Sequence, residues 1–187
     1  MTGREHGLLL AEQLLTLALT AMLLTVALAG WQDWRDMARA RQWSQQMQLS
    51  LAALRRQAMR EERELTLCGS ADGQHCNAVA TGAWLVFADT GGDGLRQPTE
   101  PGWSLQPAVP AHWRALWRSF RNQPQMIWLA SGDAATANGT LTLCPPTAHD
   151  AALRQLVIGK SGRVRLVQPA QAGATTLRAA RAVCGWP

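Results

Sequence analysis

The basic residues near the C-terminal end of the chain have the types and spacing best suited to binding chemistry. Scattered charges usually form a solvated face, but residues 151–187 contain no acidic side chain at all, which favours an anionic partner. The six basic side chains in this segment are Arg154, Lys160, Arg163, Arg165, Arg178 and Arg181.

Some of these cations fall in a predicted β-hairpin. The segment Gly159-Lys160-Ser161-Gly162 is rich in turn-forming residues and joins two β-like runs. Alternation along the second strand puts Arg163 and Arg165 on one face, about 6.7 Å apart, with Val164 and Leu166 turned to the core. Two guanidiniums with an ammonium at the tip suit a phosphate backbone, because arginine binds phosphate in bidentate fashion.

Four cysteines, Cys68, Cys76, Cys144 and Cys184, form the second group with distinctive chemistry. An even number in an exported domain predicts two disulfides, for which three pairings are open. The proximity of Cys68 to Cys76 favours a local bridge and leaves Cys144 for Cys184. A zinc site is the less favoured alternative, since there is no C-x2-C spacing and only His75 lies beside a cysteine.

Other candidate sites are weaker, and we expect no metal, no cofactor and no enzyme. The loop from Asp89 to Glu100, with Asp93 and Gly94 inside it, partly matches a calcium loop. Gly91 lacks the required ligand, however, and a turn-rich loop is the favoured interpretation. The four histidines are isolated, and the expected disulfides leave no thiol to act as a nucleophile.

One acidic residue, Glu12, lies inside a long apolar run. Leu8 to Ala29 is otherwise free of ionisable residues, and a helix of this length would measure about 33 Å, enough to cross a bilayer core of ~30 Å. A carboxylate inside such a helix costs about 2.5–3.5 kcal/mol, so its presence requires a partner. The run is too long for a cleaved secretory signal, and an ordinary anchor would have no use for the charge.

The segment Gly7-Leu8-Leu9-Leu10-Ala11-Glu12 resembles the class III signal of type IV pilins and pseudopilins. This resemblance implies that prepilin peptidase cuts between Gly7 and Leu8 in the inner membrane, that the new amine is N-methylated, and that Glu12 becomes the fifth mature residue. Glu12 would then pair with the amine of a neighbouring subunit during assembly. The chain departs from the family pattern in having Leu8 and Leu9 where phenylalanine and threonine are common.

The 187 residues suffice for one domain and an anchor, and their periodicity predicts how the two are joined. No proline precedes Pro98, so one helix is expected from Leu8 to about Glu64. Its second half carries an apolar stripe that predicts packing on a sheet. The stripe comprises Ala40, Trp43, Met47, Leu51, Leu54, Ala58 and Leu65. The expected strands are 83–87, 125–130, 140–144, 155–158 and 163–167, with a short helix at 110–120.

The head resembles the GspH/FimT family of pilin-like proteins, through segments whose order and spacing match across nearly the whole chain. The segments are 65–76 around the first two cysteines, 84–89, 139–144, 161–165, and the final Cys184. The resemblance implies an α+β, type IV pilin-like fold in which a long N-terminal helix packs on an antiparallel β-sheet head. The implied parts are a leader (1–7), a transmembrane segment (8–30), an amphipathic helix segment (31–66) and a periplasmic β-rich head (67–187).

The same resemblance implies a minor pilin of the FimT/FimU kind, which primes or caps a type IV pilus together with other pilins. Its Gly-Arg-x-Arg signature resembles the one associated with DNA capture in competence-linked pilins. Two alternatives stay open: a GspH-like pseudopilin of type II secretion, and a periplasmic binding module on an ordinary anchor. The candidate DNA-binding residues are Lys160, Arg163, Arg165, Arg178 and Arg181.

Overall fold

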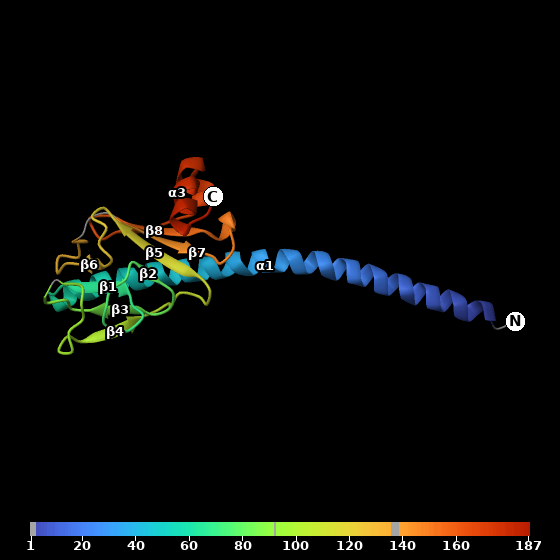
Figure 1. The fold of residues 1–187 in the computed structure, drawn as a ribbon, viewed down its shortest axis with the longest axis horizontal. Coiled ribbons are helices and arrows are strands. Elements are labelled where there is room, and N and C mark those ends of the chain that lie inside the picture. Colours follow the sequence, from blue (N-terminus) through green and yellow to red (C-terminus); the bar gives the residue numbers. More distant parts are fainter. Residues whose placement is uncertain (1–2, 92, 136–138) are drawn as a thin grey trace. The chain divides into compact units, whose positions relative to one another are not determined.

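The structure is a computed structural model that describes residues 3–91, 93–135 and 139–187, without the side chains of residues 3–11 and 26–29. Helices and short antiparallel strands make up this part of the chain (Figure 1). In chain order the elements are α1 (Gly3–Glu61), β1 (Leu65–Gly69), β2 (Val79–Ala80), β3 (Trp84–Phe87), β4 (Gly102–Leu105), β5 (Arg114–Ser119), β6 (Met126–Trp128), β7 (Gly139–Cys144), the 3-10 helix η1 (Asp150–Ala152), β8 (Arg154–Ile158), β9 (Val164–Val167), α2 (Pro169–Ala172) and α3 (Ala174–Cys184).

The chain divides into two compact units, which are described separately below. The first, Met1–Asp36, contains the apolar part of α1. The second, Met37–Pro187, contains the rest of α1 and all the strands, and we call it the head. The single helix expected from Leu8 to about Glu64 is confirmed over most of that range, although it ends at Glu61. Glu62 follows with a φ of 50°, which turns the chain out of the helix.

The head contains two antiparallel sheets that share one core with α1. Their strand orders are β4-β3-β1-β6 and β2-β5-β7-β8-β9. The predicted apolar stripe is confirmed from Ala40 to Ala58, whose side chains are buried together with residues of both sheets. Leu65 is also buried, but it lies in β1 rather than on the helix. Trp43 and Met47 of the helix thus share a core with Trp128 of β6 and Leu141 of β7. The observed architecture is the predicted one, a long helix packed on an antiparallel β-sheet head.

Polar side chains of α1 tie the helix to backbone groups at several points of the head. Trp43 Nε1 donates a hydrogen bond to the carbonyl of residue 108, at 3.0 Å, and Gln48 Nε2 donates to Val164 O, at 3.2 Å. Further along the helix, Arg55 Nε donates to Gly132 O at 2.7 Å. Since each bond satisfies a carbonyl outside the helix, the helix is fixed in register against the head as well as packed on it.

Most of the expected strands are present, but the expected helix at 110–120 is wrong. This segment contains β5, which pairs with β7 from Arg114↔Cys144 to Ser119↔Gly139. Alternate residues Trp113, Ala115 and Trp117 are buried, which is the period of a strand rather than of a helix. Strands β3, β6, β7, β8 and β9 match expected strands to within two residues, whereas β1, β2, β4 and the C-terminal helix α3 were not expected.

Candidate functional site

The apolar part of α1 carries a solvent-exposed carboxylate on an otherwise lipid-compatible surface. Glu12 is exposed, and so are the large apolar side chains that follow it. The hydroxyls of Thr16, Thr20 and Thr25 each donate to the carbonyl three residues earlier, at 2.8–2.9 Å, so they need no other partner. The exposed apolar side chains are Leu14, Leu15, Leu17, Leu19, Met22, Leu23 and Leu24.

Among the described residues there is one helix, α1, that is long enough and apolar enough to cross a membrane. Its first turns contain Gly7 and Leu8, whose backbone is helical. Burial of each exposed leucine in lipid or against another helix would contribute about 1.5–3 kcal/mol. Glu12 is the feature that this burial does not explain, because a carboxylate gains nothing from an apolar environment.

An aromatic pair follows the apolar stretch, and the sequence analysis missed it. Trp31 and Trp34 are 54% and 56% exposed, and their ring centroids are 5.1 Å apart. Tryptophan is enriched where a transmembrane helix leaves the hydrocarbon layer, since its ring is apolar and its N–H stays hydrated. The signal was available in the sequence as two tryptophans within the four residues after Gly30.

The predicted basic hairpin is present at the edge of the five-stranded sheet. Strands β8 and β9 pair from Gln155↔Val167 to Ile158↔Val164. Arg163 and Arg165 are exposed, while Val164 and Leu166 pack against the core, as the alternation predicted. Lys160 lies at the exposed tip of the turn.

The turn of the hairpin is held by backbone contacts rather than left loose. Gly162 has a φ of 71°, and a Cβ at this position would lie 2.2 Å from Gly132 O, so glycine is required for both reasons. The amide of residue 134 donates to Lys160 O at 2.9 Å, and Gly159 N donates to Arg163 O at 2.9 Å. These contacts hold the backbone that carries the cations in place against the neighbouring loop.

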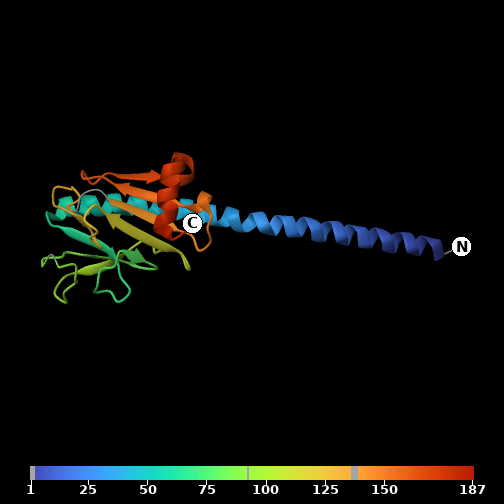
Figure 2. The ribbon, with the colours of Figure 1, turned by 45° about the horizontal axis from the view of Figure 1, so that its top comes forward.

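The structure separates the other two candidate cations from the hairpin tip. Arg178 and Arg181 lie on α3, which is placed at the end of β8 and β9 opposite the turn (Figures 1 and 2). Arg181 donates through Nε to Asp150 Oδ1 at 2.8 Å and through a second nitrogen to Oδ2. The guanidinium lowers the pKa of Asp150, and this carboxylate raises the pKa of Arg181. Arg181 is therefore a structural ion-pair partner.

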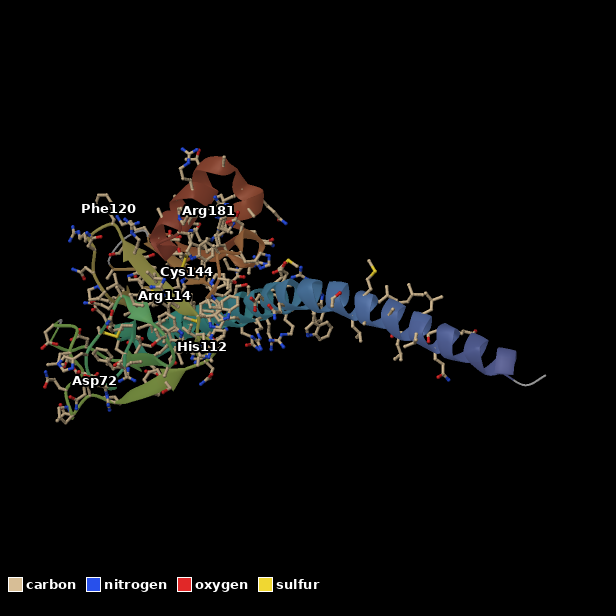
Figure 3. All side chains as sticks on the ribbon, turned by 45° about the vertical axis from the view of Figure 1, so that its right-hand side comes forward. Asp72, His112, Arg114, Phe120, Cys144 and Arg181 are labelled. Atoms are coloured by element: carbon tan, nitrogen blue, oxygen red, sulfur yellow. A yellow bond between two sulfur atoms is a disulfide. The ribbon has the colours of Figure 1, made fainter. Side chains whose placement is uncertain are left out.

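Three residues that the sequence analysis missed lie at the same end of the sheet as the hairpin turn. Arg118 lies on the outer side of β5, one residue before the strand ends, and Phe120 and Arg121 follow the strand. All three are exposed, and Figure 3 shows Phe120 at the periphery of the head. Phe120 is the last residue of the helix expected at 110–120, and that wrong assignment gave no indication of its exposure.

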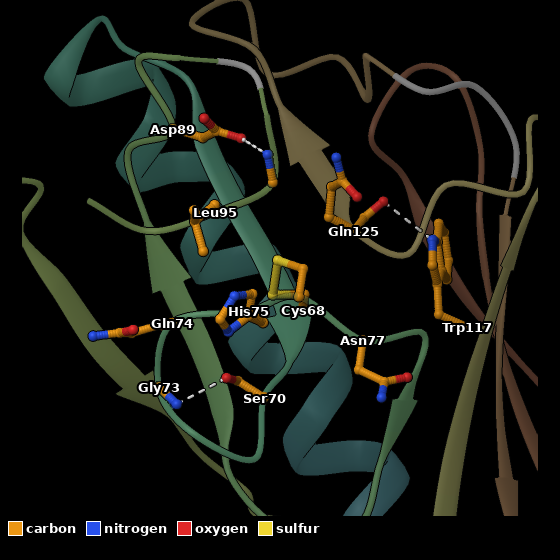
Figure 4. The surroundings of a disulfide bond; sticks show 12 residues. Cys68, Ser70, Gly73, Gln74, His75, Asn77, Asp89, Leu95, Trp117 and Gln125 are labelled. Atoms are coloured by element: carbon orange, nitrogen blue, oxygen red, sulfur yellow. Dashed lines mark hydrogen bonds between the residues drawn. A yellow bond between two sulfur atoms is a disulfide. The ribbon is translucent and has the colours of Figure 1, made fainter.

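The two disulfides join Cys68 to Cys76 and Cys144 to Cys184, the pairing that the spacing favoured. Figure 4 shows the first one, with His75 and Leu95 beside it. The loop that it closes is ordered by Asp72, whose Oδ1 accepts hydrogen bonds at 2.9 Å from the amides of residue 74 and His75. These bonds hold the pKa of Asp72 well below its usual range.

The carboxylates of the Asp89–Glu100 loop are occupied by backbone amides. Glu100 is only 4% exposed and accepts from Thr90 N at 2.8 Å, from the Thr90 hydroxyl at 2.7 Å, and from Gln97 N at 2.9 Å. Asp89 accepts from Gly94 N at 2.8 Å. The hydrogen bond from Gln97 N, followed by those from Thr90, lowers the pKa of Glu100. A cation would have to displace these donors, so the turn-rich loop is the better description.

Known proteins share parts of this sequence and this architecture. The model of a family described as type II transport protein GspH matches residues 44–162. No curated protein matches the chain. The type IV minor pilin FimU of Pseudomonas aeruginosa (strain PAO1) is similar in structure, with a TM-score of 0.51 and 14% identity over 70% of this chain and 89% of that chain.

The minor pseudopilin EpsH from the type 2 secretion system of Vibrio cholerae is similar to the same degree. Its TM-score is 0.50 at 17% identity, over 71% of this chain and 98% of that chain. At such identities the two likenesses concern the fold, which is a pilin-like helix on a β-sheet head. The match to the family model covers more than half of the sequence. This chain belongs to the GspH family, and its fold is pilin-like.

Proposed function

We propose that the chain is a minor pilin of a type IV pilus. Before assembly, the apolar part of α1 would hold it in the bacterial inner membrane, with the head in the periplasm. The observation that carries the proposal is the exposed carboxylate of Glu12, the one ionisable side chain in the sequence from Leu8 to Ala29. Such a charge costs about 2.5–3.5 kcal/mol in lipid, and a counter-charge supplied on assembly would offset that cost.

Removal of the leader would supply that counter-charge. Cleavage by prepilin peptidase between Gly7 and Leu8 creates an amine, which is then N-methylated and stays cationic. Glu12 of one subunit would pair with this amine on the next subunit as the helices stack. Since a misaligned helix would leave both charges unpaired in an apolar environment, the pair sets the axial register of the filament.

Replacement of Glu12 tests this role. The full chain carrying Glu12→Ala should remain in the membrane but should be reduced at least about tenfold in sheared filaments, because a buried pair that loses one partner costs roughly 3–5 kcal/mol. Glu12→Asp should retain part of the incorporation. Gln13→Ala, the matched control at the neighbouring polar residue, should behave as the wild type. Normal incorporation of the Glu12→Ala chain would refute the proposed role.

We further propose that the hairpin binds DNA through its phosphate backbone during uptake. Lys160, Arg163 and Arg165 present their charges from one end of the sheet, whereas Arg178 is a separate exposed cation and Arg181 is engaged by Asp150. Contact of this kind would be independent of sequence, because phosphates are the same at every base.

The salt dependence of DNA binding tests the hairpin. Replacing Arg163 and Arg165 by alanine removes two phosphate contacts, so the slope of log K against log salt should fall by about 1.8. Arg56 and Arg60 are exposed arginines of α1 and give a control variant with the same change of net charge. Equal slopes for the two double variants would remove the DNA-binding proposal and leave the pilin proposal intact.

A second candidate function is a pseudopilin of type II secretion. Two observations favour it: the family description refers to type II transport, and the match to EpsH covers 98% of that chain. Deletion of the gene separates the candidates. Loss of surface pili and of DNA uptake supports the minor pilin, whereas retention of secreted enzymes inside the periplasm supports the pseudopilin.

A further inference from the structure

The end of β5 exposes an aromatic ring between two cations. Phe120 is 84% exposed, more than the other exposed large apolar side chains of the described residues. Arg118 and Arg121 flank it and are exposed as well. Arg118 is an outward residue of β5, and Phe120 begins the turn that directly follows this strand. The ring is therefore flanked in the chain by two exposed arginines.

A rigid turn holds the ring in this position. Ser119 points inward and is buried; its Oγ accepts a hydrogen bond from Gln123 N at 2.9 Å, and its carbonyl accepts from Asn122 N at 3.2 Å. Asn122 adopts a φ of 53°, which completes the turn. These hydrogen bonds fix the backbone of the turn, which carries the Phe120 side chain into solvent.

The ring lies at the same end of the sheet as the basic hairpin. The register Ser119↔Gly139, Gly139↔Ile158 and Ile158↔Val164 aligns the end of β5 with the start of β9. Three strand spacings of about 4.8 Å separate them, roughly 14 Å in all. The neighbouring outward row runs from Arg118 through residues 140 and 157 to Arg165, and contains no acidic residue. Ala179 and Val183 of α3 border the row beside Arg118 and residue 140, and the arginines at its two ends are exposed, so a polyanion can contact both.

We propose that Phe120 stacks on an unpaired base of a DNA strand whose phosphates lie along the row from Arg118 to Arg165, so that the protein prefers single-stranded DNA or frayed ends to intact duplex. This inference rests on the DNA binding proposed for the hairpin. The ring and the cations supply the two elements of single-strand binding, an aromatic platform and a basic track. Inside a closed duplex the base faces are stacked on one another, so the ring could reach one only by unstacking a base step, which costs a few kcal/mol.

Titration of the full chain in detergent micelles with a labelled single strand, and with the blunt duplex of the same sequence, tests the inference. The wild type should bind the single strand more tightly. Phe120→Ala should weaken single-strand binding about 5- to 150-fold, the range of base–aromatic stacking, and should change duplex binding less than about twofold. Phe120→Trp should keep the single-strand preference. Leu49→Ala removes an apolar side chain that is 70% exposed on α1 and should change neither affinity.

The outcomes separate this inference from the hairpin proposal. If Phe120→Ala leaves single-strand binding unchanged, or weakens both probes equally, stacking is refuted while the hairpin proposal stands. If Arg163→Ala with Arg165→Ala changes neither probe, the DNA-binding proposal fails and the stacking inference fails with it. Loss of filament incorporation by Phe120→Ala with DNA binding intact would identify the ring as a contact to another subunit and would also overturn the inference.

Discussion

The disulfide between Cys144 and Cys184 should contribute more to the stability of the head than the one between Cys68 and Cys76. Helix α3 rests on a small satellite cluster, in which Leu153 and Ala180 are the buried residues besides the two cysteines. One further tie is the hydrogen bond from Arg114 to Cys184 O, at 3.0 Å. The cluster is small and its other members, Leu116, Leu177 and Trp186, are only partly buried, so we expect the covalent link to be important for keeping α3 on the sheet.

The expected magnitude follows from the lengths of the two closed loops. Cys144 and Cys184 are 40 residues apart, and Cys68 and Cys76 are 8 apart. Loop-closure entropy then gives about 4 kcal/mol for the longer loop and about 2.5 kcal/mol for the shorter one. For a domain of this size, each kcal/mol shifts the melting temperature by about 2–4 °C, so paired replacement by alanine should lower it by about 8–16 °C and 5–10 °C respectively.

Thermal unfolding of the full chain in detergent, followed by tryptophan fluorescence, measures both effects. The near-ultraviolet circular dichroism of each variant at low temperature shows whether the rest of the head is still packed. A Cys144/Cys184 variant that melts within about 2 °C of the wild type would refute the reasoning, since 2 °C corresponds to at most ~1 kcal/mol. So would a larger loss in the Cys68/Cys76 variant.

Three further predictions concern packing, pH and an ion pair. Gly139→Ala should destabilise the head by about 1–3 kcal/mol in urea unfolding, because its Cβ would lie 1.9 Å from the ring of Trp117; unchanged stability would mean that the ring has room to move. The pKa of Glu100 is lowered in the folded state, so its contribution is present above its ordinary value of 4.5 and is lost as pH falls through the folded pKa. Glu100→Gln should therefore flatten the acid limb of the stability–pH curve, and an unaltered limb would contradict this. Arg181→Ala should leave the midpoint of urea unfolding almost unchanged, since Arg181 and Asp150 are both substantially exposed; a clearly lower midpoint would show that the pair holds α3 in place.

Features that follow from the periodicity of residue types could be predicted from the sequence alone. The stripe from Ala40 to Ala58 repeats at helical spacing, and each of its members is buried. The turn residues at 159–162 predicted the hairpin, and the two-residue period then put Arg163 and Arg165 outside. Such signals are local, because they depend only on residues within one element.

The features that were missed depend on long-range pairing. In the segment 110–120, tryptophans at positions 113 and 117 fit a helix of period four, and they fit a strand of period two equally well. The segment forms a strand because it pairs with β7, and Phe120, which follows that strand, is exposed to solvent. The ion pair between Arg181 and Asp150 spans 31 residues, and no sequence signal connects the two.

The most direct test of filament assembly through Glu12 is the intact mass of the mature chain recovered from sheared filaments. We expect a chain that begins at Leu8, carries one methyl group on its amine, and is depleted from this fraction when Glu12 is alanine. A recovered chain that begins at Met1 or Gly30, or a Glu12→Ala chain present at the wild-type amount, would contradict the proposed role of the carboxylate.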